Sequence, residues 1–293
     1  MSKLQEVAEQ QVAMNTIFNL TGVFEGLASM RIASVKNQVL ESQAFFSEIW
    51  HIYQQLRVDS LFRFGRTNED ELIKKQLYII ITAEGGFGGD IDQRLIKTML
   101  ADYNPDKQDI VVIGHHGALL LIQQHVGFKK YFTLPSRDRN INVRPLVQEV
   151  RRYESTAVFY QTYVSLMVQE GKRIELQSAV ASQGKAASEQ KKNATKDKKE
   201  EDEIISEDTY IFEPSTFDVV AHLERSMTEI ALSQVILDSK LAQYAARFRA
   251  MSMAKDRAND LVSDLRLQFN RTKRHIQDER LKEMINGMRM GGK

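Results

Sequence analysis

The C-terminal part of this chain is an uninterrupted helix signal. Residues 215–286, 72 consecutive positions, contain neither glycine nor proline. All four prolines precede this segment, and Pro214 stands immediately before it, where a proline can close a loop and start a helix. At about 1.5 Å per residue, such a helix would be roughly 100 Å long, far longer than a small domain is wide. The sequence therefore predicts an element that leaves its domain, which favours a mechanical or scaffolding role over a pocket.

A second long helix is predicted over residues 4–57, which contain no proline and two glycines, Gly22 and Gly26. Seven apolar residues and one threonine recur there at steps of one, three or four, as on one face of a helix: Met14, Ile17, Phe18, Thr21, Phe24, Ala28, Ile32 and Val35. The two glycines share one face. They either admit the close backbone of a partner or are a mild local weakness, since each costs about 1 kcal/mol relative to alanine.

The two long helices are predicted to pair in antiparallel orientation on either side of a central domain. A stripe in the second helix follows alternating steps of three and four residues, typical of a left-handed coiled coil. It consists of Leu241, Tyr244, Phe248, Met251, Lys255, Ala258, Val262, Leu265, Phe269, Thr272 and Ile276. The first helix is about 20 residues shorter, so the second would overhang by roughly 30 Å. That tip carries Met284, Ile285, Met288 and Met290, apolar side chains that we expect to lie against a partner.

Residues 58–214 alternate strand and helix signals. Strands are predicted at 76–82, 109–113, 156–168 and 172–181, with a hairpin turn at 169–172, and helices at 91–103, 115–125 and 145–153. The predicted fold class is therefore α/β: a long antiparallel two-helix coiled coil from the N- and C-terminal segments (1–57 and 215–293) plus a central α/β (Rossmann-like) domain. Residues 182–208 are charged and lack aromatic residues, so we expect a mobile insertion.

The residues that could carry chemistry do not predict an active site, a metal or a cofactor. The chain has no cysteine. The loop EGGFGGD at 84–90 lies between a strand and a helix, but it lacks the Gly-Lys-Ser/Thr of a phosphate loop and has an acid at each end. We interpret it as a tight turn with close packing. His115 and His116 are adjacent, a spacing that rarely ligates one metal, so we assign them a surface or turn role.

The charge and hydropathy of the chain limit the classes of partner that we expect. The net charge of +1 gives no reason to expect nucleic acid. The N-terminal residues lack the pattern of a signal or transit peptide, and no apolar run reaches the 18 residues of a membrane span. We therefore expect membrane contact through partners only. A basic band at Arg271, Lys273, Arg274 and His275 is either a solvated helix face or a collar for acidic groups of a surrounding protein.

Three segments resemble the gamma subunit of F-type ATP synthases. ITAEGGFGGDI at 81–91 resembles the family's strand and DRGLCGGLN turn, with Glu84 and Gly85 in place of Asp-Arg. YIFEP at 210–214 resembles the YxYEP before the C-terminal helix, and AARFRAM at 245–251 is similar to AARMxAM. The last similarity continues through Ala254, Asn259, Leu265, Leu267, Asn270, Arg274, Ile276, Glu279, Glu283 and Gly287. The order of long helix, α/β domain and long helix fits over the whole length.

The resemblance implies a central rotor stalk that does no bond chemistry itself. The coiled coil would turn inside a ring of catalytic alpha and beta subunits, and the α/β domain would rest on the membrane c-ring with the epsilon subunit. Proton or sodium flow would drive rotation. The implied location is peripheral, on the cytoplasmic face of a bacterial inner membrane, or on an organellar inner membrane if the chain is a mature form. The alternative is a non-rotary coiled-coil scaffold or tether.

On this resemblance we predict contact residues in two places. Rotor–stator contacts are expected at Arg247, Met251, Arg271, Arg274, Ile276, Met284, Ile285 and Met288. Residues 277–290 would form a bearing tip, and the basic residues from 271 to 274 would pass torque or latch. A turn facing the c-ring or epsilon subunit is expected at Gly85, Gly86, Gly88 and Gly89.

Overall fold

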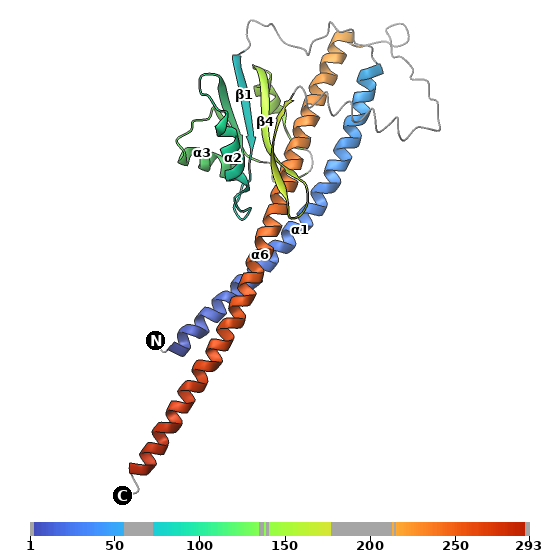
Figure 1. Cartoon of the computed structure of the whole chain (residues 1–293). Coiled ribbons are helices and arrows are strands. Elements are labelled where there is room, and N and C mark those ends of the chain that lie inside the picture. Colours follow the sequence, from blue (N-terminus) through green and yellow to red (C-terminus); the bar gives the residue numbers. More distant parts are fainter. Residues whose placement is uncertain are drawn as a thin grey trace, which may run out of the picture. The chain divides into compact units, whose positions relative to one another are not determined.

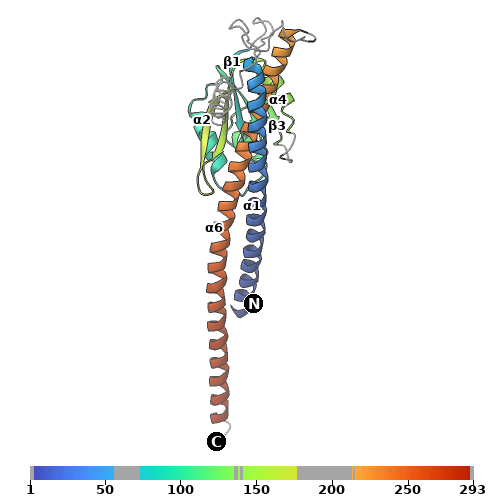
Figure 2. The ribbon, with the colours of Figure 1, turned by 90° about the vertical axis from the view of Figure 1, so that its right-hand side faces the viewer.

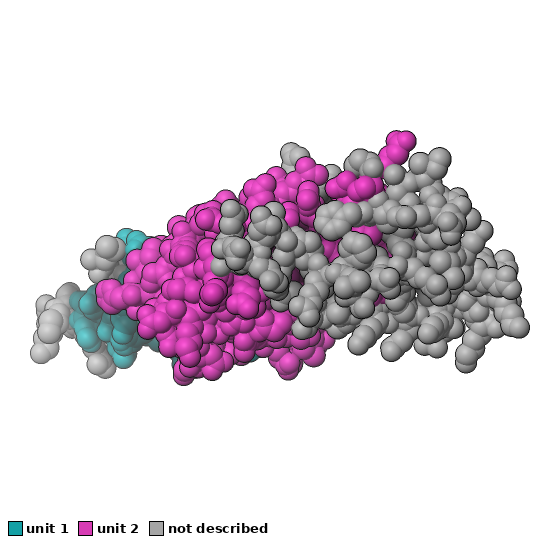
Figure 3. All heavy atoms as spheres, turned by 90° about the horizontal axis from the view of Figure 1, so that it is seen from above, with its two compact units in different colours: residues 1–29, 247–293 teal, residues 30–246 magenta. Residues whose placement is uncertain are grey.

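The computed structural model describes residues 3–55, 73–134, 138, 141–176, 213 and 215–290. The chain forms two compact units, residues 1–29 with 247–293 (unit 1) and residues 30–246 (unit 2; Figure 3). Helices α1 (Lys3–Gln55) and α6 (Thr216–Met290) contribute to both units and confirm the two predicted long helices. The proposed domain boundaries after residues 57 and 214, the insertion at 182–208 and most of the YIFEP motif lie outside the described residues.

Unit 2 contains a mixed sheet. Its strands, among the described residues, are β1 (Ile73–Ile81), β2 (Gln108–Ile113), β3 (Lys130–Phe132), β4 (Tyr153–Tyr163) and β5 (Gln169–Glu175). The strand order is β3-β2-β1-β4-β5. The first four strands are parallel, and β5 runs antiparallel to β4. This order, with helices between the parallel strands, is that of a doubly wound α/β fold, as the strand and helix signals predict.

Helices cover both faces of the sheet (Figure 1). Helices α2 (Ile91–Ala101) and α3 (His115–Gln123) pack on one face, and α4 (Arg144–Val150) and α6 pack on the other. Successive side chains of β1 alternate between these layers. Ile79 and Ile81 face α4 and α6, whereas Tyr78 and Ile80 face α2 and α3. Burying each such side chain contributes about 1.5–3 kcal/mol, which explains the continuous apolar run of a central parallel strand.

The predicted hairpin turn at 169–172 is wrong. The connection between β4 and β5 consists of residues 164–168, and Gln169 already pairs with Tyr163. Ser165 stabilises this connection because its hydroxyl accepts from the amide of Val168 at 3.1 Å. Gly171 lies within β5, where an added Cβ would come 3.2 Å from Leu95 of α2. This glycine therefore serves strand packing, and its turn-forming character misled the prediction. The short strand β3, with only three residues, was not predicted.

In unit 2, α1 and α6 pack side by side in antiparallel orientation (Figures 1 and 2). Val35 of α1 packs with Leu241 of α6, and Phe46 packs with Met227, so residue numbers rise along one helix as they fall along the other. The predicted antiparallel pairing is thus confirmed. Within the described part of the chain, no helix combines the length and hydropathy needed to span a membrane.

A buried carboxylate anchors the amino edge of the sheet. Asp109 in β2 is 7% exposed. It contacts Lys129 Nζ at 2.6 Å and Lys75 Nζ at 3.6 Å, and it accepts a hydrogen bond from the Tyr153 hydroxyl at 3.1 Å. Burial acts to raise the pKa of Asp109, but the hydrogen bonds from Lys129 and Tyr153 outweigh it and lower the pKa below its ordinary value of 3.8. The same contact raises the pKa of Lys129.

This cluster predicts an acid-sensitive contribution to stability. Because folding lowers the pKa of Asp109, its contribution is present above the unfolded pKa of about 4 and is lost as the pH falls through the folded value. We expect Asp109→Asn to lower the urea midpoint at pH 7 and to have a smaller effect near pH 3. Exposed Asp106→Asn is the control. A loss from Asp109→Asn that is equal at both pH values would contradict this account.

Candidate functional site

In unit 1, the predicted seam of α6 is confirmed. Met251 and Ala258 are buried, and the other stripe members from Lys255 to Ile276 are half-buried, whereas most of the intervening residues are exposed. On α1, Val7, Thr21 and Ala28 are buried. Two members of the predicted α1 stripe are misplaced, since Ile17 is 42% and Phe24 is 37% exposed. The steps of three and four residues in α6 therefore predict the contact face better than the looser pattern in α1.

One ion pair interrupts this apolar seam. Lys255 occupies a stripe position, and its Nζ lies 2.8 Å from Glu25 Oε2. The hydrogen bond from Lys255 lowers the pKa of Glu25 and outweighs the opposing effect of burial. A polar pair at a seam position sets the register of two helices, because a shifted register would separate the charges. Gly22 and Gly26 do not admit a close backbone, since an added Cβ would meet only the Lys255 side chain at Gly22 and nothing at Gly26.

The structure separates the predicted contact residues of α6 by exposure. Met251 is 7% exposed and packs inside the seam, so it can affect a partner only by holding the seam together. Ile276 is half-buried, and so is Arg247, whereas Arg271 and Arg274 are exposed. Within the basic band, His275 Nε2 lies 3.3 Å from Glu279 Oε1. All residues from 277 to 288 are exposed.

The exposed end of α6 carries a second apolar face, which we call the tip face: Leu281, Met284, Ile285 and Met288, with exposures of 55%, 56%, 49% and 77%. Leu281 and Met288 lie about 120–140° around the helix from Ile276, so the tip face does not continue the seam. From Ile276 to the end of α6 at Met290 the helix extends about 20 Å, less than the roughly 30 Å predicted. Leu281 was missed from the sequence, although its spacing of seven from Met288 was visible.

Helix α1 also carries an outward apolar stripe, which the sequence interpretation missed. It consists of Val12, Leu20, Val23 and Leu27, with exposures of 68%, 52%, 60% and 47%. These residues lie about 140–160° around the helix from buried Val7. Both helices of unit 1 therefore have apolar side chains in the seam and on an outer face. Alternating steps of three and four residues from Leu20 to Leu27 could have revealed this stripe.

The glycine loop is a turn, but its glycines are not closely packed. An added Cβ would meet nothing at Gly85, Gly86 or Gly89, and only the Ile91 side chain at 3.6 Å at Gly88. The turn is exposed, and Phe87 at its apex is 62% exposed with φ at 69°. The part of our interpretation that expected close packing is therefore wrong at these positions.

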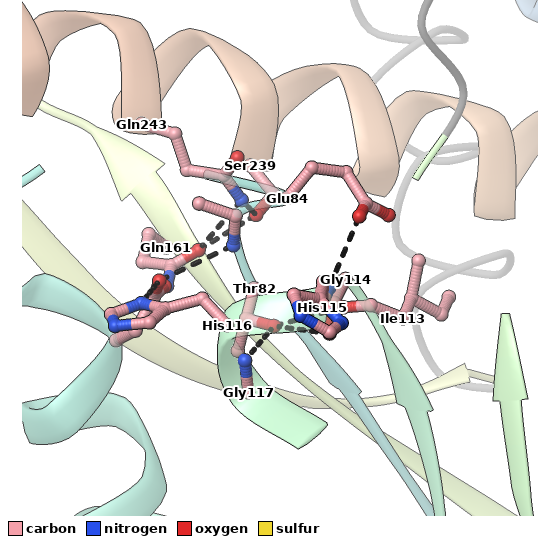
Figure 4. Close-up of polar contacts among 12 residues, drawn as sticks. Thr82, Glu84, Ile113, Gly114, His115, His116, Gly117, Gln161, Ser239 and Gln243 are labelled. Carbon is pink, nitrogen blue, oxygen red and sulfur yellow. Dashed lines mark hydrogen bonds and ion pairs between the residues drawn. The ribbon is translucent and has the colours of Figure 1, made fainter. Parts of the chain in front are cut away.

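Close packing occurs instead at the start of α3. At Gly114, where φ is 103°, an added Cβ would collide with the carbonyl oxygen of Thr82, and at Gly117 it would collide with the Thr82 side chain. Thr82 Oγ1 accepts a hydrogen bond from the Gly117 amide at 3.0 Å and donates to the Ile113 carbonyl at 3.1 Å. These glycines bring α3 directly against the end of β1 (Figure 4).

Glu84 supplies acceptors for the N-terminus of α3 (Figure 4). Its carboxylate accepts a hydrogen bond from the His115 amide at 3.3 Å. It accepts another from the Leu134 amide. A carboxylate at this position satisfies a helix N–H group and complements the helix dipole. Burial, with a further contribution from Glu84, raises the pKa of the neighbouring Tyr131. Glu84 therefore supplies a negative charge at a helix N-terminus, a position that holds phosphate groups in some other folds.

His116 lies in the first turn of α3 with its side chain 31% exposed, in line with the surface or turn role, but it also contacts a buried polar network that the sequence did not reveal. His116 Nδ1 lies 2.7 Å from Asp92 Oδ2, and the Asp92 side chain is 2% exposed. Gln161 Nε2 donates to Asp92 Oδ1 at 2.7 Å. This network lies at the carboxyl ends of β1 and β4, the place where doubly wound folds bind dinucleotides (Figure 4). His115 is exposed.

Comparison with known proteins agrees with this arrangement. A family model described as ATP synthase matches residues 3–289. The ATP synthase gamma chain of Trichlorobacter lovleyi is 21% identical over 303 residues, covering 98% of both chains. That of Enterococcus hirae is 28% identical over 223 residues, covering 73% of this chain and 70% of its own. The chain belongs to the ATP synthase gamma family.

Solved structures show that the gamma-family fold extends over most of the chain. A chain from the Tetrahymena thermophila mitochondrial ATP synthase central stalk and c-ring has a TM-score of 0.56 at 14% identity, covering 80% of this chain and 99% of its own. A chain from the Euglena gracilis mitochondrial ATP synthase has a TM-score of 0.52 at 14% identity, covering 94% and 93%. Glu84, which departs from the gamma-family turn motif, has a structural role as the cap of α3.

The seam of this gamma-family member predicts different costs for two neighbouring methionines. Met251→Ala removes a buried side chain, so we expect the free energy of unfolding to fall by about 2–4 kcal/mol. Met253 is 48% exposed, so we expect Met253→Ala to change it by less than about 0.5 kcal/mol. Guanidinium denaturation followed by helix circular dichroism measures both. Equal effects of the two substitutions would mean that Met251 does not support the seam.

Proposed function

We propose that this chain is the central rotor stalk of an F-type ATP synthase, a non-catalytic subunit that couples ion flow to the cycling of catalytic alpha and beta subunits. Family membership over residues 3–289 supports the assignment. The main structural support for a stalk that turns within other subunits is the pair of exposed apolar surfaces in unit 1. The outward stripe of α1 and the tip face of α6 both present large apolar side chains to solvent.

These surfaces favour a surrounding sleeve over a simple tether. A scaffold that formed a homodimer would cover one side of a helix pair, whereas apolar side chains opposite the seam call for contact on the outer sides as well. An apolar tip can also turn within a sleeve without breaking fixed ion pairs. Exposed Arg271 and Arg274, just before the tip, are placed to meet acidic groups of the surrounding subunits and to pass torque or latch.

The remaining assignments follow the family. Alpha and beta subunits would surround the coil, and the epsilon subunit and the membrane c-ring would contact the α/β domain. Proton or sodium flow through the ring would drive rotation. The chain would then be peripheral, held at the cytoplasmic face of a bacterial inner membrane or at the matching face of an organellar inner membrane. The absence of a membrane-spanning helix among the described residues is compatible with attachment through partners.

The tip face provides the most direct mutational test. We expect glutamine at Leu281, Met284, Ile285 and Met288 together to weaken assembly with alpha and beta subunits by about ten-fold or more, since 1.4 kcal/mol of lost burial already suffices. Truncation after Gln277 should likewise weaken assembly and should lower the rate of coupled ATP synthesis. The matched control neutralises Asp278, Arg280, Lys282 and Glu283 and leaves the net charge unchanged. Normal assembly and synthesis in the truncated chain would refute the bearing role.

The exposed turn at Gly85, Gly86, Gly88 and Gly89 is proposed as a contact to the epsilon subunit or the c-ring. It lies at the carboxyl edge of the sheet, the edge at which Ser239 of α6 is bonded to β4. Because α6 continues from there into the part that alpha and beta subunits would surround, these subunits are the competing partners of the turn. Because the chain has no cysteine, a photo-cross-linker on Phe87→Cys labels one site, and Gly127→Cys, between α3 and β3, is the control. Adducts with epsilon or ring subunits are expected, and adducts with alpha or beta alone would overturn the assignment.

A further inference from the structure

One turn of α6 carries an unusual concentration of buried polar side chains. Ser239, Lys240 and Gln243 are 0%, 2% and 5% exposed. Apart from Gln234, the buried positions on either side are apolar: Leu232, Val235, Ile236, Leu237, Leu241 and Ala242. Buried polar groups cost free energy unless they are hydrogen-bonded, so their placement in one turn requires partners on the facing elements. We call residues 239–243 the polar turn.

On the sheet side, the polar turn is bonded through Gln161 at the carboxyl end of β4 (Figure 4). The Ser239 hydroxyl donates to Gln161 Oε1 at 2.7 Å, and Gln243 Nε2 donates to Ser239 Oγ at 3.1 Å. Gln161 is fully buried, and its amide nitrogen continues the chain of bonds to Asp92 of α2. Asp92 in turn contacts His116 of α3. The network therefore joins α6 to the helix layer on the opposite face of the sheet.

A second link leaves the polar turn in another direction. Lys240 forms an ion pair with Asp138, which lies between β3 and α4, and both side chains are almost fully buried. Asp138 also accepts a hydrogen bond from Arg31 Nη1 of α1 at 3.2 Å. Lys240 projects about 100° around the helix from Ser239. The α/β domain thus holds α6 from two directions, and one of these links also reaches α1.

These bonds do what the apolar contacts cannot. Apolar contacts are non-directional, so they oppose a slide by one turn of about 5.4 Å, or a rotation against the sheet, only through packing. Either displacement would leave the Asp138 and Lys240 charges and the Gln161 amide buried without partners, which is strongly unfavourable. The polar turn therefore determines both the axial and the rotational position of α6 on the α/β domain.

We propose that the polar turn is the point at which rotation of the α/β domain is transmitted to α6, with Gln161 and Asp138 as the positioning residues on the domain. The proposal has two parts. The register part, that the polar turn fixes the position of α6 on the α/β domain, does not depend on the proposed rotor function. The transmission part, that torque passes through this contact, rests on that function. A stalk that carries torque needs a contact that resists rotation of the helix relative to the domain. The directional bonds of Ser239, Lys240 and Gln243 resist such rotation, within an interface whose other contacts are mainly apolar and non-directional.

The register part is tested on the isolated full-length chain. Gln161→Leu, Ser239→Ala and Gln243→Leu together replace the three side chains that link α6 to β4 by apolar groups of similar size. Asp92 keeps its contact with His116, and the Lys240–Asp138 ion pair stays in place. Spin labels on cysteines at exposed Ile122 and Arg225 report the position of α6 relative to α3, since the chain has no cysteine of its own. We expect a narrow distance distribution in the parent chain and a broadened or shifted one in the triple variant. An unchanged distribution would overturn the register role of the Gln161 link, because the Lys240–Asp138 ion pair, which this variant keeps, would then suffice to fix α6.

The transmission part is tested in the complex with alpha, beta and membrane-sector subunits. ATP hydrolysis and ATP-driven ion pumping are measured on the same vesicles. For the triple variant we expect hydrolysis within about two-fold of the parent and a pumping-to-hydrolysis ratio that falls several-fold. An unchanged ratio would overturn transmission through the Gln161 link of the polar turn. A parent complex that hydrolyses ATP without pumping would instead count against the proposed rotor function.

Two further variants separate transmission from general stability. Thr156→Val alters a buried hydroxyl on the same strand that has no hydrogen-bond partner, so we expect both readouts to match the parent. Ser239→Ala alone retains the Gln161–Asp92 bond and serves if the triple variant does not fold. It should reduce the pumping ratio in the same direction to a smaller extent. Loss of coupling in Thr156→Val equal to that of the polar-turn variants would refute the assignment.

Discussion

The burial of helix α6 along its apolar side is the contact on which both units depend. In unit 2 this side is covered by the sheet and by the first helix, with Leu232, Val235 and Leu237 fully buried. In unit 1, among the residues that the structure describes, α1 covers this side, and the buried surface of α6 narrows to a stripe of single residues at steps of three and four. A helix pair that buries only one stripe leaves its other faces available to partners. This difference in coverage is why we place the proposed partner contacts in unit 1.

The architecture was predictable because the pattern of apolar residues differs between the segments that form strands and those that form helices. The β-branched run ending at Ile81 and the heptad from Leu241 to Ile276 each match one element, and the structure confirms both. The turn at 164–168 was missed because Gly171, a packing residue inside β5, attracted the prediction. The tip contacts stay predictions, because exposure of Met284 and Ile285 shows availability and not a partner. Leu281 and the outward stripe of α1 were readable from spacing but were overlooked.

The buried polar contacts could not have been predicted from one sequence. Gln161, Asp138 and Ser239 are separated by many residues, and none lies in a motif that signals pairing. Their roles follow from topology, because the carboxyl ends of β1 and β4 meet where α6 crosses the sheet. In dinucleotide-binding folds this crevice holds a ligand. Here side chains of the protein itself are hydrogen-bonded across it, and we propose that this contact is the joint between domain and helix.

The central claim is that this chain rotates as a unit within a ring of catalytic subunits. A bead attached at Ile122→Cys, on the exposed face of α3, reports that motion when the alpha and beta subunits are fixed to a surface. On addition of ATP, the account predicts sustained rotation of the bead in one direction. ATP hydrolysis at a normal rate by the same bead-bearing complexes, with no rotation, would contradict it.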